Sequence, residues 1–330
     1  MKNYNINIPA LCDMLGLGKL VSEPAPLSGG LLHKMFDVRT ANGRFAIKTL
    51  NPNIMERPEA YSNYIFSEET AEKLSERIAV SCAKKFDGKF LNKLDSQYYL
   101  VYDFIEGQAV LPNEISPQHA YKIGEVLGEI HNADIYTENS ENKTIDINWH
   151  FYCEQGKASP WHESFAEVLD TLCLLTEKAN GAFQSFSGEK IVCHRDMDAK
   201  NVLWQGLSPI IIDWESAGAE YPQKDFIETA LYWSQNEDMS VRDDCFTAFA
   251  EGYKTKRNFG KIDWETLLYS CLCNKLEWLE YNLKRSLKIE CADEAEQKLG
   301  TEQVLLTIGE IKNFYKNFDR IIELAEKISV

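Results

Sequence analysis

The stretch that decides the fold runs Ile191-Val192-Cys193-His194-Arg195-Asp196-Met197-Asp198-Ala199-Lys200-Asn201-Val202-Leu203-Trp204 and resumes shortly afterwards as Ile210-Ile211-Ile212-Asp213-Trp214-Glu215. Two apolar, β-branched runs bracket a polar loop, which predicts strands on either side of it. Three acid or amide side chains, those of Asp196, Asn201 and Asp213, stand where these runs end or turn. Oxygen atoms in such positions can hold a divalent cation and accept a proton.

This arrangement has the groups that transfer of the γ-phosphoryl group of ATP requires. The reaction needs a hydroxyl held in line and Mg²⁺ to neutralise the phosphates. Asp196 is placed to accept the proton of the hydroxyl, and Asn201 and Asp213 supply the hard oxygen ligands that Mg²⁺ prefers. His194 is expected to hold the shape of the catalytic loop. The alternative is a solvated turn between two core strands.

The spacing His-Arg-Asp, four residues, Asn resembles the catalytic loop of protein-kinase-like enzymes. The chain is most similar to the aminoglycoside phosphotransferase and choline kinase branch. Asp213-Trp214-Glu215 replaces the Asp-Phe-Gly of protein kinases, Asp198 stands where they carry a lysine, and no Ala-Pro-Glu follows. Because there is no activation segment, a small-molecule acceptor is expected.

The resemblance implies an α+β, bilobal protein-kinase-like fold, with a small antiparallel sheet in the N-lobe and a mostly helical C-lobe. We expect residues 1–105 to form the nucleotide-binding lobe, ending at the hinge, and residues 106–330 to form the catalytic and acceptor-binding lobe. The expected helices of the second lobe are Pro117–Asn132, Trp161–Ala179, Lys224–Trp233, Asp243–Lys254, Asp263–Leu287 and Glu302–Ile328.

Upstream, Phe45-Ala46-Ile47-Lys48 closely matches the kinase Val-Ala-Ile-Lys strand. It forms the second arm of a hairpin that turns at Ala41-Asn42-Gly43, where Asn-Gly is a strong turn signal. The period of two puts Ala46 and Lys48 on one face and Phe45 and Ile47 on the other. Lys48 is expected to hold the α- and β-phosphates, and the small Ala46 leaves room for adenine. The alternative is an exposed strand lysine.

A lysine in that role needs an acidic partner on the next helix, and the segment from Tyr61 to Arg77 has a helical pattern. We expect Glu68 to be this partner because it shares a face with the inward-looking Ala71. Glu69 is an equal alternative, and most glutamates on such a helix only form its solvated face.

Two further segments are candidates for nucleotide binding. Ser28, Gly29 and Gly30 are expected to cover the phosphates with backbone amides, although a Gly-Gly pair is as often an ordinary turn. The strand that begins at Tyr98 breaks at Glu106-Gly107 and is predicted to be the hinge. The resemblance implies that main-chain groups of Asp103 and Ile105 bind adenine, with Tyr102 at the back of the pocket; a plain buried strand is the alternative.

Four residues of the second lobe are candidates for binding the acceptor. Trp149 and Tyr152 could stack on a sugar or on a quaternary ammonium group, and they are equally suited to packing. Glu277 and Tyr281 are four residues apart on a predicted helix, share a face and could bind an amine. A helix-core role for Tyr281 is the alternative. Asp225 is expected to anchor the catalytic loop.

Composition narrows the class of partner. The formal net charge of −16 argues against nucleic acid, because phosphate backbones attract basic surfaces, and it suits a cationic acceptor as well as simple solubility. No apolar run reaches membrane-spanning length and no secretory signal is present at the N-terminus, so a cytoplasmic protein is expected. The nine cysteines show no paired metal-ligand spacing. A monomer or a homodimer is expected.

The function predicted from the sequence is an ATP- or GTP-dependent, Mg²⁺-dependent kinase that phosphorylates a hydroxyl group of a small, cationic or polyhydroxylated molecule. Aminoglycoside-like antibiotics are the first class expected, which would make the enzyme a resistance factor. The first alternative is a metabolic kinase acting on choline, homoserine, methylthioribose or a sugar. The second is a non-catalytic nucleotide-binding protein, against which the retention of Lys48, Asp196, Asn201 and Asp213 argues.

Overall fold

The computed structural model describes residues 4–27, 32–133, 135, 144–185, 188–236, 240–258 and 262–328. The chain forms two compact units. Unit 1 comprises Met1–Ala109 and Lys200–Ala217, and unit 2 comprises Val110–Ala199 and Gly218–Val330. The expected lobe boundary at residue 105 stays a prediction.

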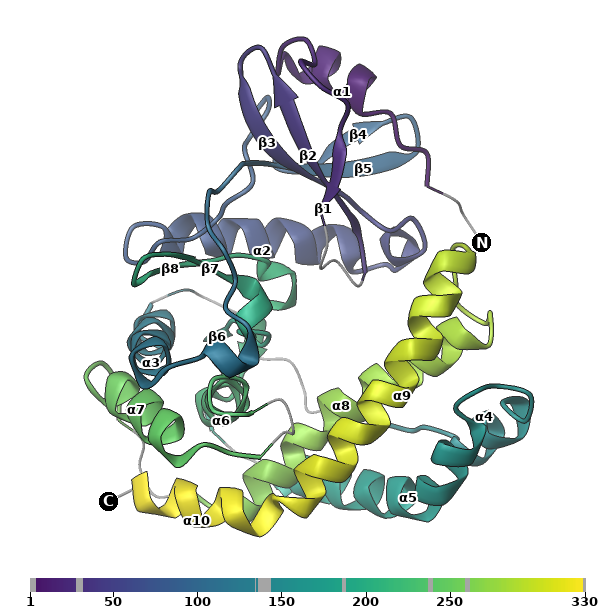
Figure 1. Cartoon of the computed structure of the whole chain (residues 1–330), viewed down its shortest axis with the longest axis vertical. Helices are drawn as coiled ribbons and strands as arrows, with labels where there is room; N and C mark the ends of the chain where they lie inside the picture. The colour runs from purple at the N-terminus through teal and green to yellow at the C-terminus, as the bar shows by residue number, and fades with distance from the viewer. Residues whose placement is uncertain are drawn as a thin grey trace. The chain divides into compact units, whose positions relative to one another are not determined.

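Unit 1 is built on an antiparallel sheet with the spatial order β1-β2-β3-β5-β4 (Figure 1). The expected hairpin joins β2 to β3, with Thr40 paired to Gly43 across the turn. The strands are β1 (Ala25–Leu27), β2 (Lys34–Thr40), β3 (Gly43–Thr49), β4 (Asn92–Leu94) and β5 (Gln97–Asp103). The other elements of unit 1 are α1 (Ile8–Leu15), η1 (Ile54–Glu56), α2 (Ala60–Leu74), β7 (Val202–Gln205), β8 (Ser208–Ile211) and η4 (Trp214–Ser216).

The two faces of the sheet bury different sets of side chains. Phe45 and Ile47 of β3 pack in one cluster with Leu11 of α1. Tyr64 of α2 and Leu100 of β5 belong to a second cluster. The alternation expected along β3 is therefore present, because successive side chains of a strand point to opposite faces. The face of β3 opposite α1 carries Ala46 and Lys48.

Unit 2 is mostly helical, and α8 packs against both α5 and α9 (Figure 1). A short antiparallel pair, β6 with β9, completes it. The elements are η2 (Pro112–Glu114), α3 (Pro117–His131), α4 (Trp149–Gln155), α5 (His162–Ser185), β6 (Ile191–Cys193), β9 (Gly218–Glu220), α6 (Pro222–Tyr232), α7 (Asp243–Lys254), α8 (Trp264–Ser286), α9 (Glu294–Lys316) and α10 (Phe318–Ile328). A short turn, η3 (Ala199–Asn201), crosses the boundary between the units. The predicted α+β class, with its N-terminal antiparallel sheet and helical C-terminal part, is confirmed.

Helices α3 and α7 approach each other closely because two glycines face the contact. A Cβ atom at Gly124 would lie 2.1 Å from the carbonyl oxygen of Phe249, and one at Gly252 would lie 2.0 Å from that of Tyr121. No side chain can be accommodated at such distances without moving backbone. These two glycines therefore set the spacing of the helix pair that carries His131 at its end.

The predicted helix from Glu302 to Ile328 is wrong in its limits, since two helices, α9 and α10, occupy this region. Helix α9 begins earlier because the side chain of Asp293 caps it, accepting a hydrogen bond from the amide of Glu296. The break lies at Asn317, whose side-chain amide donates to the carbonyl oxygen of Asn313. Such local bonds compete with continuation of the helix.

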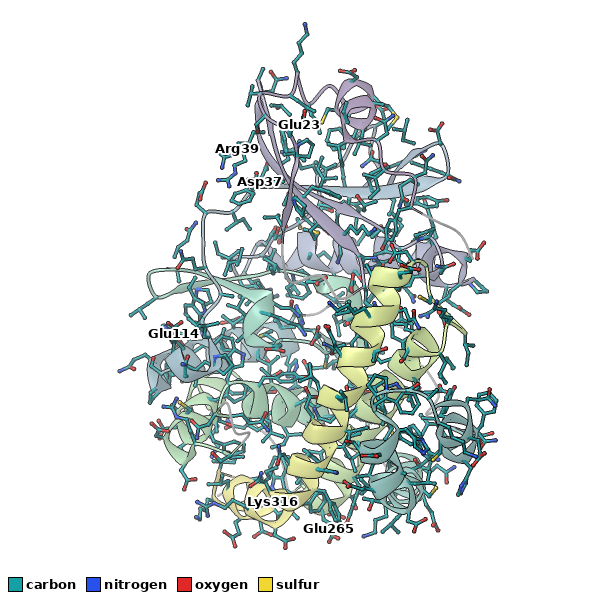
Figure 2. All side chains as sticks on the ribbon, turned by 45° about the vertical axis from the view of Figure 1, so that its right-hand side comes forward. Glu23, Asp37, Arg39, Glu114, Glu265 and Lys316 are labelled. Carbon is teal, nitrogen blue, oxygen red and sulfur yellow. The ribbon has the colours of Figure 1, made fainter. Side chains whose placement is uncertain are left out.

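The surface of the described residues is rich in exposed charged side chains, such as those of Glu23, Glu114, Glu265 and Lys316 (Figure 2). On β2, Asp37 forms an ion pair with Arg44 of β3 at 2.8 Å. None of the helices described is both long enough and apolar enough to span a membrane.

Candidate active site

Lys48 lies in a buried polar cluster of unit 1. It is on the central strand β3, with Leu100 of β5 opposite it, and is 7% exposed. Its Nζ lies 2.7 Å from Oδ1 of Asp213 and 2.5 Å from Oε2 of Glu215. Burial alone would lower the pKa of Lys48, but the two carboxylates outweigh it and raise that pKa well above its ordinary value. Lys48 is therefore a fixed positive charge and not an exposed strand lysine.

The hairpin of β7 and β8 brings Asn201 beside the segment that carries Asp213. Val202 pairs with Ile211, and the amide of Ile212 donates to the carbonyl oxygen of Asn201 at 3.0 Å. Asp213 itself adopts a left-handed backbone conformation with φ +61°. Aspartate tolerates this conformation better than most residues, and it turns the chain sharply at the end of the strand. The two residues proposed as metal ligands thus flank one hairpin.

Glu215 is a member of the cluster to which the sequence analysis gave no role. Its Oε2 lies 3.2 Å from Nε2 of His33, which in turn lies 2.6 Å from the hydroxyl of Tyr64. Burial would raise the pKa of Glu215, but the ammonium of Lys48 and the ring of His33 hold it far below its ordinary value. The signal in the sequence was the Asp213-x-Glu215 spacing at the end of an apolar run.

Glu68 points into unit 1, whereas Glu69 is exposed. The carboxylate of Glu68 accepts hydrogen bonds from the hydroxyl of Tyr102 at 2.6 Å and from the amide of Ala83 at 2.7 Å. Burial raises its pKa. Among the described residues, the ion pair expected between Lys48 and Glu68 is not formed, because Lys48 contacts Asp213 and Glu215 instead. The pairing of Lys48 with Glu68 stays a prediction.

The other nucleotide candidates lie along β5 and after it. Tyr102 is paired with Ala46 across the sheet. The carboxylate of Asp103 is exposed and pairs with Lys84 at 2.8 Å. The main-chain groups of Ile105 make no hydrogen bond within the part of the chain that the structure describes. Ser28, Gly29 and Gly30 lie outside the described residues.

In unit 2, the loop after β6 carries His194, Arg195 and Asp196. His194 is fully buried, and its Nδ1 accepts a hydrogen bond from the amide of Asp196 at 3.3 Å, which fits the expected role of holding the loop. Arg195 has a left-handed backbone with φ +67°. The indole of Trp233 donates to the carbonyl oxygen of Met197 at 2.8 Å. The loop that carries the half-buried Asp196 is therefore held by hydrogen bonds to His194 and Trp233.

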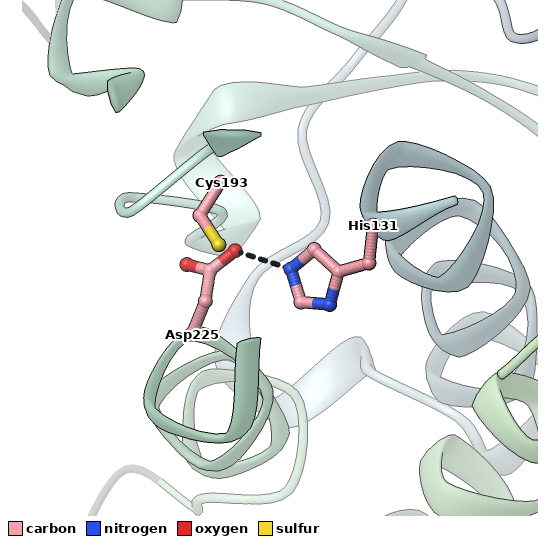
Figure 3. A group of neighbouring side chains, drawn as sticks. All are labelled: His131, Cys193 and Asp225. Carbon is pink, nitrogen blue, oxygen red and sulfur yellow. Dashed lines mark hydrogen bonds and ion pairs between the residues drawn. The ribbon is translucent and has the colours of Figure 1, made fainter. Parts of the chain in front are cut away.

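Asp225 of α6 anchors this loop. One carboxylate oxygen accepts a hydrogen bond from the backbone amide of Arg195 at 2.9 Å. The other oxygen lies 3.0 Å from Nε2 of His131 (Figure 3). Burial would raise the pKa of Asp225, but the hydrogen bond from His131 and the nearby histidine charges lower it. The carboxylate thereby stabilises a backbone conformation that is unfavourable for arginine.

His131, Cys193 and Asp225 place one possible ligand atom each within 4.8 Å of one another (Figure 3). All three are buried, and burial raises the pKa of the Cys193 thiol well above its ordinary value. The thiol is therefore neutral, and it donates to the carbonyl oxygen of Glu220. Because Asp225 is already bonded to Arg195 and His131, and the thiol to Glu220, we interpret the group as a hydrogen-bonded anchor of the loop.

The acceptor candidates differ in exposure. Trp149 is 2% exposed, and its indole donates a hydrogen bond to the hydroxyl of Thr176. Tyr152 is 4% exposed, and its hydroxyl donates a hydrogen bond to the carboxylate of Glu280. These contacts favour the packing alternative for both residues.

The two candidates on α8 are more accessible. Glu277 is exposed and Tyr281 is half-buried, and the guanidinium of Arg285 lies 5.2 Å from the centroid of the Tyr281 ring. Burial of its carboxyl end raises the pKa of Glu277. The acceptor role of all four candidates stays a prediction.

Glu228 of α6 is a second residue to which the sequence analysis gave no role. The side-chain amide of Asn274 donates to it at 3.2 Å. Burial raises the pKa of Glu228 to about 7. One turn later, Tyr232 has a pKa raised by burial and by the charges of Asp196 and Glu228. This face of α6 therefore shares the acidic surroundings of Asp196.

Replacing Asp225 with Ala should strongly destabilise unit 2. The change leaves the amide of Arg195 and the ring of His131 without their acceptor in a buried place, which costs about 3–5 kcal/mol. Thermal unfolding should show a lower midpoint than that of wild type, whereas Glu154→Ala at an exposed position should leave it unchanged. An unaltered midpoint for the Asp225 variant would contradict the anchoring role.

Replacing Glu228 with Gln should stabilise the protein at alkaline pH. The pKa of this group is raised from 4.5 to about 7, so the folded chain holds a proton that the unfolded chain releases. The free energy of unfolding therefore falls as the pH rises from 4.5 to about 7. The side-chain amide of Gln does not ionise, so the variant does not show this decrease. We expect equal unfolding midpoints near pH 4 and a gain of about 1–3 kcal/mol at pH 8.

The exposed substitution Glu302→Gln is the matched control for this experiment. It should leave the difference between pH 4 and pH 8 as it is in wild type. If Glu228→Gln lowers the midpoint at pH 8, the carboxylate stabilises the folded state and the interpretation of Glu228 as a destabilised, buried acid is wrong.

Comparison with known proteins identifies the family. The model of the family described as Phosphotransferase enzyme family matches residues 23–259, which is well over half of the chain. No curated protein sequence matches the chain.

Several solved structures share the fold. A spectinomycin phosphotransferase, solved with ADP and spectinomycin, is 14% identical, with a TM-score of 0.69 over 98% of this chain and 99% of that one. An amicoumacin kinase, solved with AMP-PNP and Ca²⁺, is 12% identical, with a TM-score of 0.63 over 94% of each chain. An ethanolamine kinase from Plasmodium vivax is 14% identical, with a TM-score of 0.57 over 92% of this chain and 83% of that one.

These likenesses confirm the predicted protein-kinase-like fold. The interval matched by the family model contains Lys48, Asp196, Asn201 and Asp213. The expected resemblance to the aminoglycoside phosphotransferase and choline kinase-like family is confirmed as well. The chain belongs to the phosphotransferase enzyme family and is a phosphotransferase.

Proposed function

We propose that the enzyme transfers the γ-phosphoryl group of ATP, with Mg²⁺, to a hydroxyl group of a small cationic molecule. The observation that carries this proposal is the partly buried contact of Lys48 with Asp213, 165 residues further along the chain. A lysine and an aspartate in contact, one for the phosphates and one for the metal ion, are the two parts that nucleotide kinases bring together. GTP is the alternative donor.

On the nucleotide side, Lys48 holds the α- and β-phosphates. Ala46 and Tyr102, which are paired across the sheet, border the adenine. The main-chain groups of Asp103 and Ile105 are the proposed partners of the adenine edge, and those of Ile105 are not used elsewhere in the described residues. Ser28, Gly29 and Gly30 remain candidates for the phosphate loop.

The residues of unit 1 fit a divalent cation. Asp213 and Glu215 offer carboxylate oxygens and Asn201 offers an amide oxygen, which is the hard oxygen set that Mg²⁺ prefers. Two carboxylates around a single ammonium leave one excess negative charge in a buried place, which favours a further cation. Bound Mg²⁺ would neutralise phosphate charge. Asn201, Asp213 and Glu215 would hold it.

Asp196 is the proposed base. Its carboxylate would orient the acceptor hydroxyl and take its proton, and the bonds of His194 and Asp225 keep the loop in place for this task. The acidic surroundings on α6 support a cationic acceptor, because an ammonium group would offset the charges of Asp196 and Glu228.

Aminoglycoside-like molecules are the first acceptor class that we propose, which would make the enzyme an antibiotic resistance factor. Structural neighbours that are an aminopropanol kinase, an ethanolamine kinase and a choline kinase from Cryptosporidium parvum Iowa II support amino alcohols as the second class. Homoserine, methylthioribose and sugars are further metabolic alternatives. A cytoplasmic location, and a monomer or homodimer, complete the proposal.

Turnover of Mg²⁺-ATP by the purified protein tests the function. The panel contains aminoglycosides, spectinomycin, choline, ethanolamine, homoserine and simple sugars, and the phosphorylated product is identified by mass. Phosphorylation of one of these molecules supports the proposal and identifies the class of acceptor. Tight nucleotide binding without any turnover would favour a non-catalytic nucleotide-binding role.

A further inference from the structure

His33 makes three polar contacts inside unit 1, and their geometry defines which ring nitrogen accepts a hydrogen bond. The backbone amide of Asn51 donates to Nδ1 at 2.9 Å, so Nδ1 carries no hydrogen. The ring hydrogen therefore resides on Nε2. This atom lies 2.6 Å from the Tyr64 hydroxyl and 3.2 Å from Oε2 of Glu215. His33 is thus oriented by the backbone on one side, and its Nε2 faces Tyr64 and Glu215 on the other.

The oxygen of Glu215 that faces His33 is also the oxygen that contacts Lys48. The side chain of His33 is 1% exposed, that of Lys48 is 8% exposed and that of Glu215 is 17% exposed. When a nucleotide draws the ammonium of Lys48 towards its phosphates, Glu215 would lose one donor. The contact with Nε2 of His33 at 3.2 Å remains for it.

We propose that His33 is a positioning residue, which holds Glu215 in the orientation required for binding the metal–nucleotide complex. This inference rests on the proposed function. His33 stands directly before β2, so it links the start of this strand to the segment that carries Asp213 and Glu215. Its role is exerted through Glu215, without contact with the reacting atoms.

Two substitutions of His33 distinguish the contacts of Nδ1 from those of Nε2. In His33→Gln the amide nitrogen reaches the position of Nε2 and can still donate to Glu215. In His33→Asn the amide oxygen takes the position of Nδ1 and can still accept from Asn51, but the donor to Glu215 is lost. His33→Gln loses the contact with Asn51, whereas His33→Asn loses both contacts of Nε2, those with Tyr64 and Glu215, so the unfolding midpoint should fall further in His33→Asn.

The test is the affinity for ADP, measured by calorimetry once with saturating Mg²⁺ and once with EDTA. With Mg²⁺, we expect His33→Asn to bind about 10-fold more weakly than wild type and His33→Gln to stay within about 3-fold. With EDTA, both variants should bind ADP as wild type does. His119→Asn, at a capping position of α3 in unit 2, is the matched control and should bind as wild type in both conditions.

Equal affinity of all proteins for Mg²⁺-ADP would overturn the inference. A loss by His33→Asn that is as large with EDTA as with Mg²⁺ would overturn it too, because His33 would then act through Lys48 or through the fold. If wild type itself fails to bind Mg²⁺-ADP, the proposed function is wrong and the inference falls with it.

Discussion

Replacement of Asp196 with Asn is expected to lower kcat by about 10²–10⁴-fold, the contribution typical of a positioned acid or base. The amide has nearly the same shape as the carboxylate but cannot take the proton of the hydroxyl. Its backbone bond to His194 does not depend on the side chain, so the loop should keep its conformation. The measurement is steady-state turnover with the acceptor found in the panel.

Affinity for Mg²⁺-ADP should be nearly the same in this variant as in wild type, because the proposed base contacts the acceptor and not the nucleotide. The exposed substitution Asp244→Asn in the same unit is the control and should keep full kcat. A variant of Asp196 that retains wild-type kcat would show that another group takes the proton, or that none is needed.

Replacement of Asp213 with Ala is expected to weaken binding of Mg²⁺-ADP by about 10–100-fold, the loss typical of disturbing the ligands of a metal ion. The variant removes one proposed metal ligand and one of the two carboxylates that contact Lys48. Lys48 keeps Glu215, so the ammonium remains paired. Binding of ADP in EDTA should be retained, because one competitor for Lys48 has gone.

Glu23→Ala, at an exposed position in unit 1, is the control and should bind Mg²⁺-ADP as wild type does. Calorimetry with and without Mg²⁺ distinguishes the two effects of the Asp213 change. Equal affinity for Mg²⁺-ADP in wild type and in Asp213→Ala would count against the metal-binding role of Asp213.

Much of unit 1 was predictable because its signals are local. The Asn-Gly turn and the period-two pattern predicted β2, β3 and the side to which Lys48 points. The catalytic-loop spacing predicted the strands around Asp196 and Asp213. The limits of α9 and α10 were missed, since they depend on the cap at Asp293 and on a side-chain bond at Asn317, which a hydrophobic pattern does not report.

The choice between Glu68 and Glu69 required the folded chain. Both glutamates fit a helix, and only packing decides which one is buried. The same holds for Trp149, whose burial against Thr176 could not be distinguished from a ligand-stacking role by residue type alone. Exposure is a property of the whole structure, whereas periodicity is a property of a short segment.

The sequence by itself determined which residues can do chemistry here: one lysine, two aspartates and an asparagine at spacings that resemble a kinase. Only the tertiary structure decided that Lys48 contacts Asp213 and Glu215, and that His33 holds Glu215. The physical reason is distance along the chain. Turn and strand preferences act over a few residues, but contacts between groups more than 160 residues apart exist only once the sheet and the hairpin have packed together.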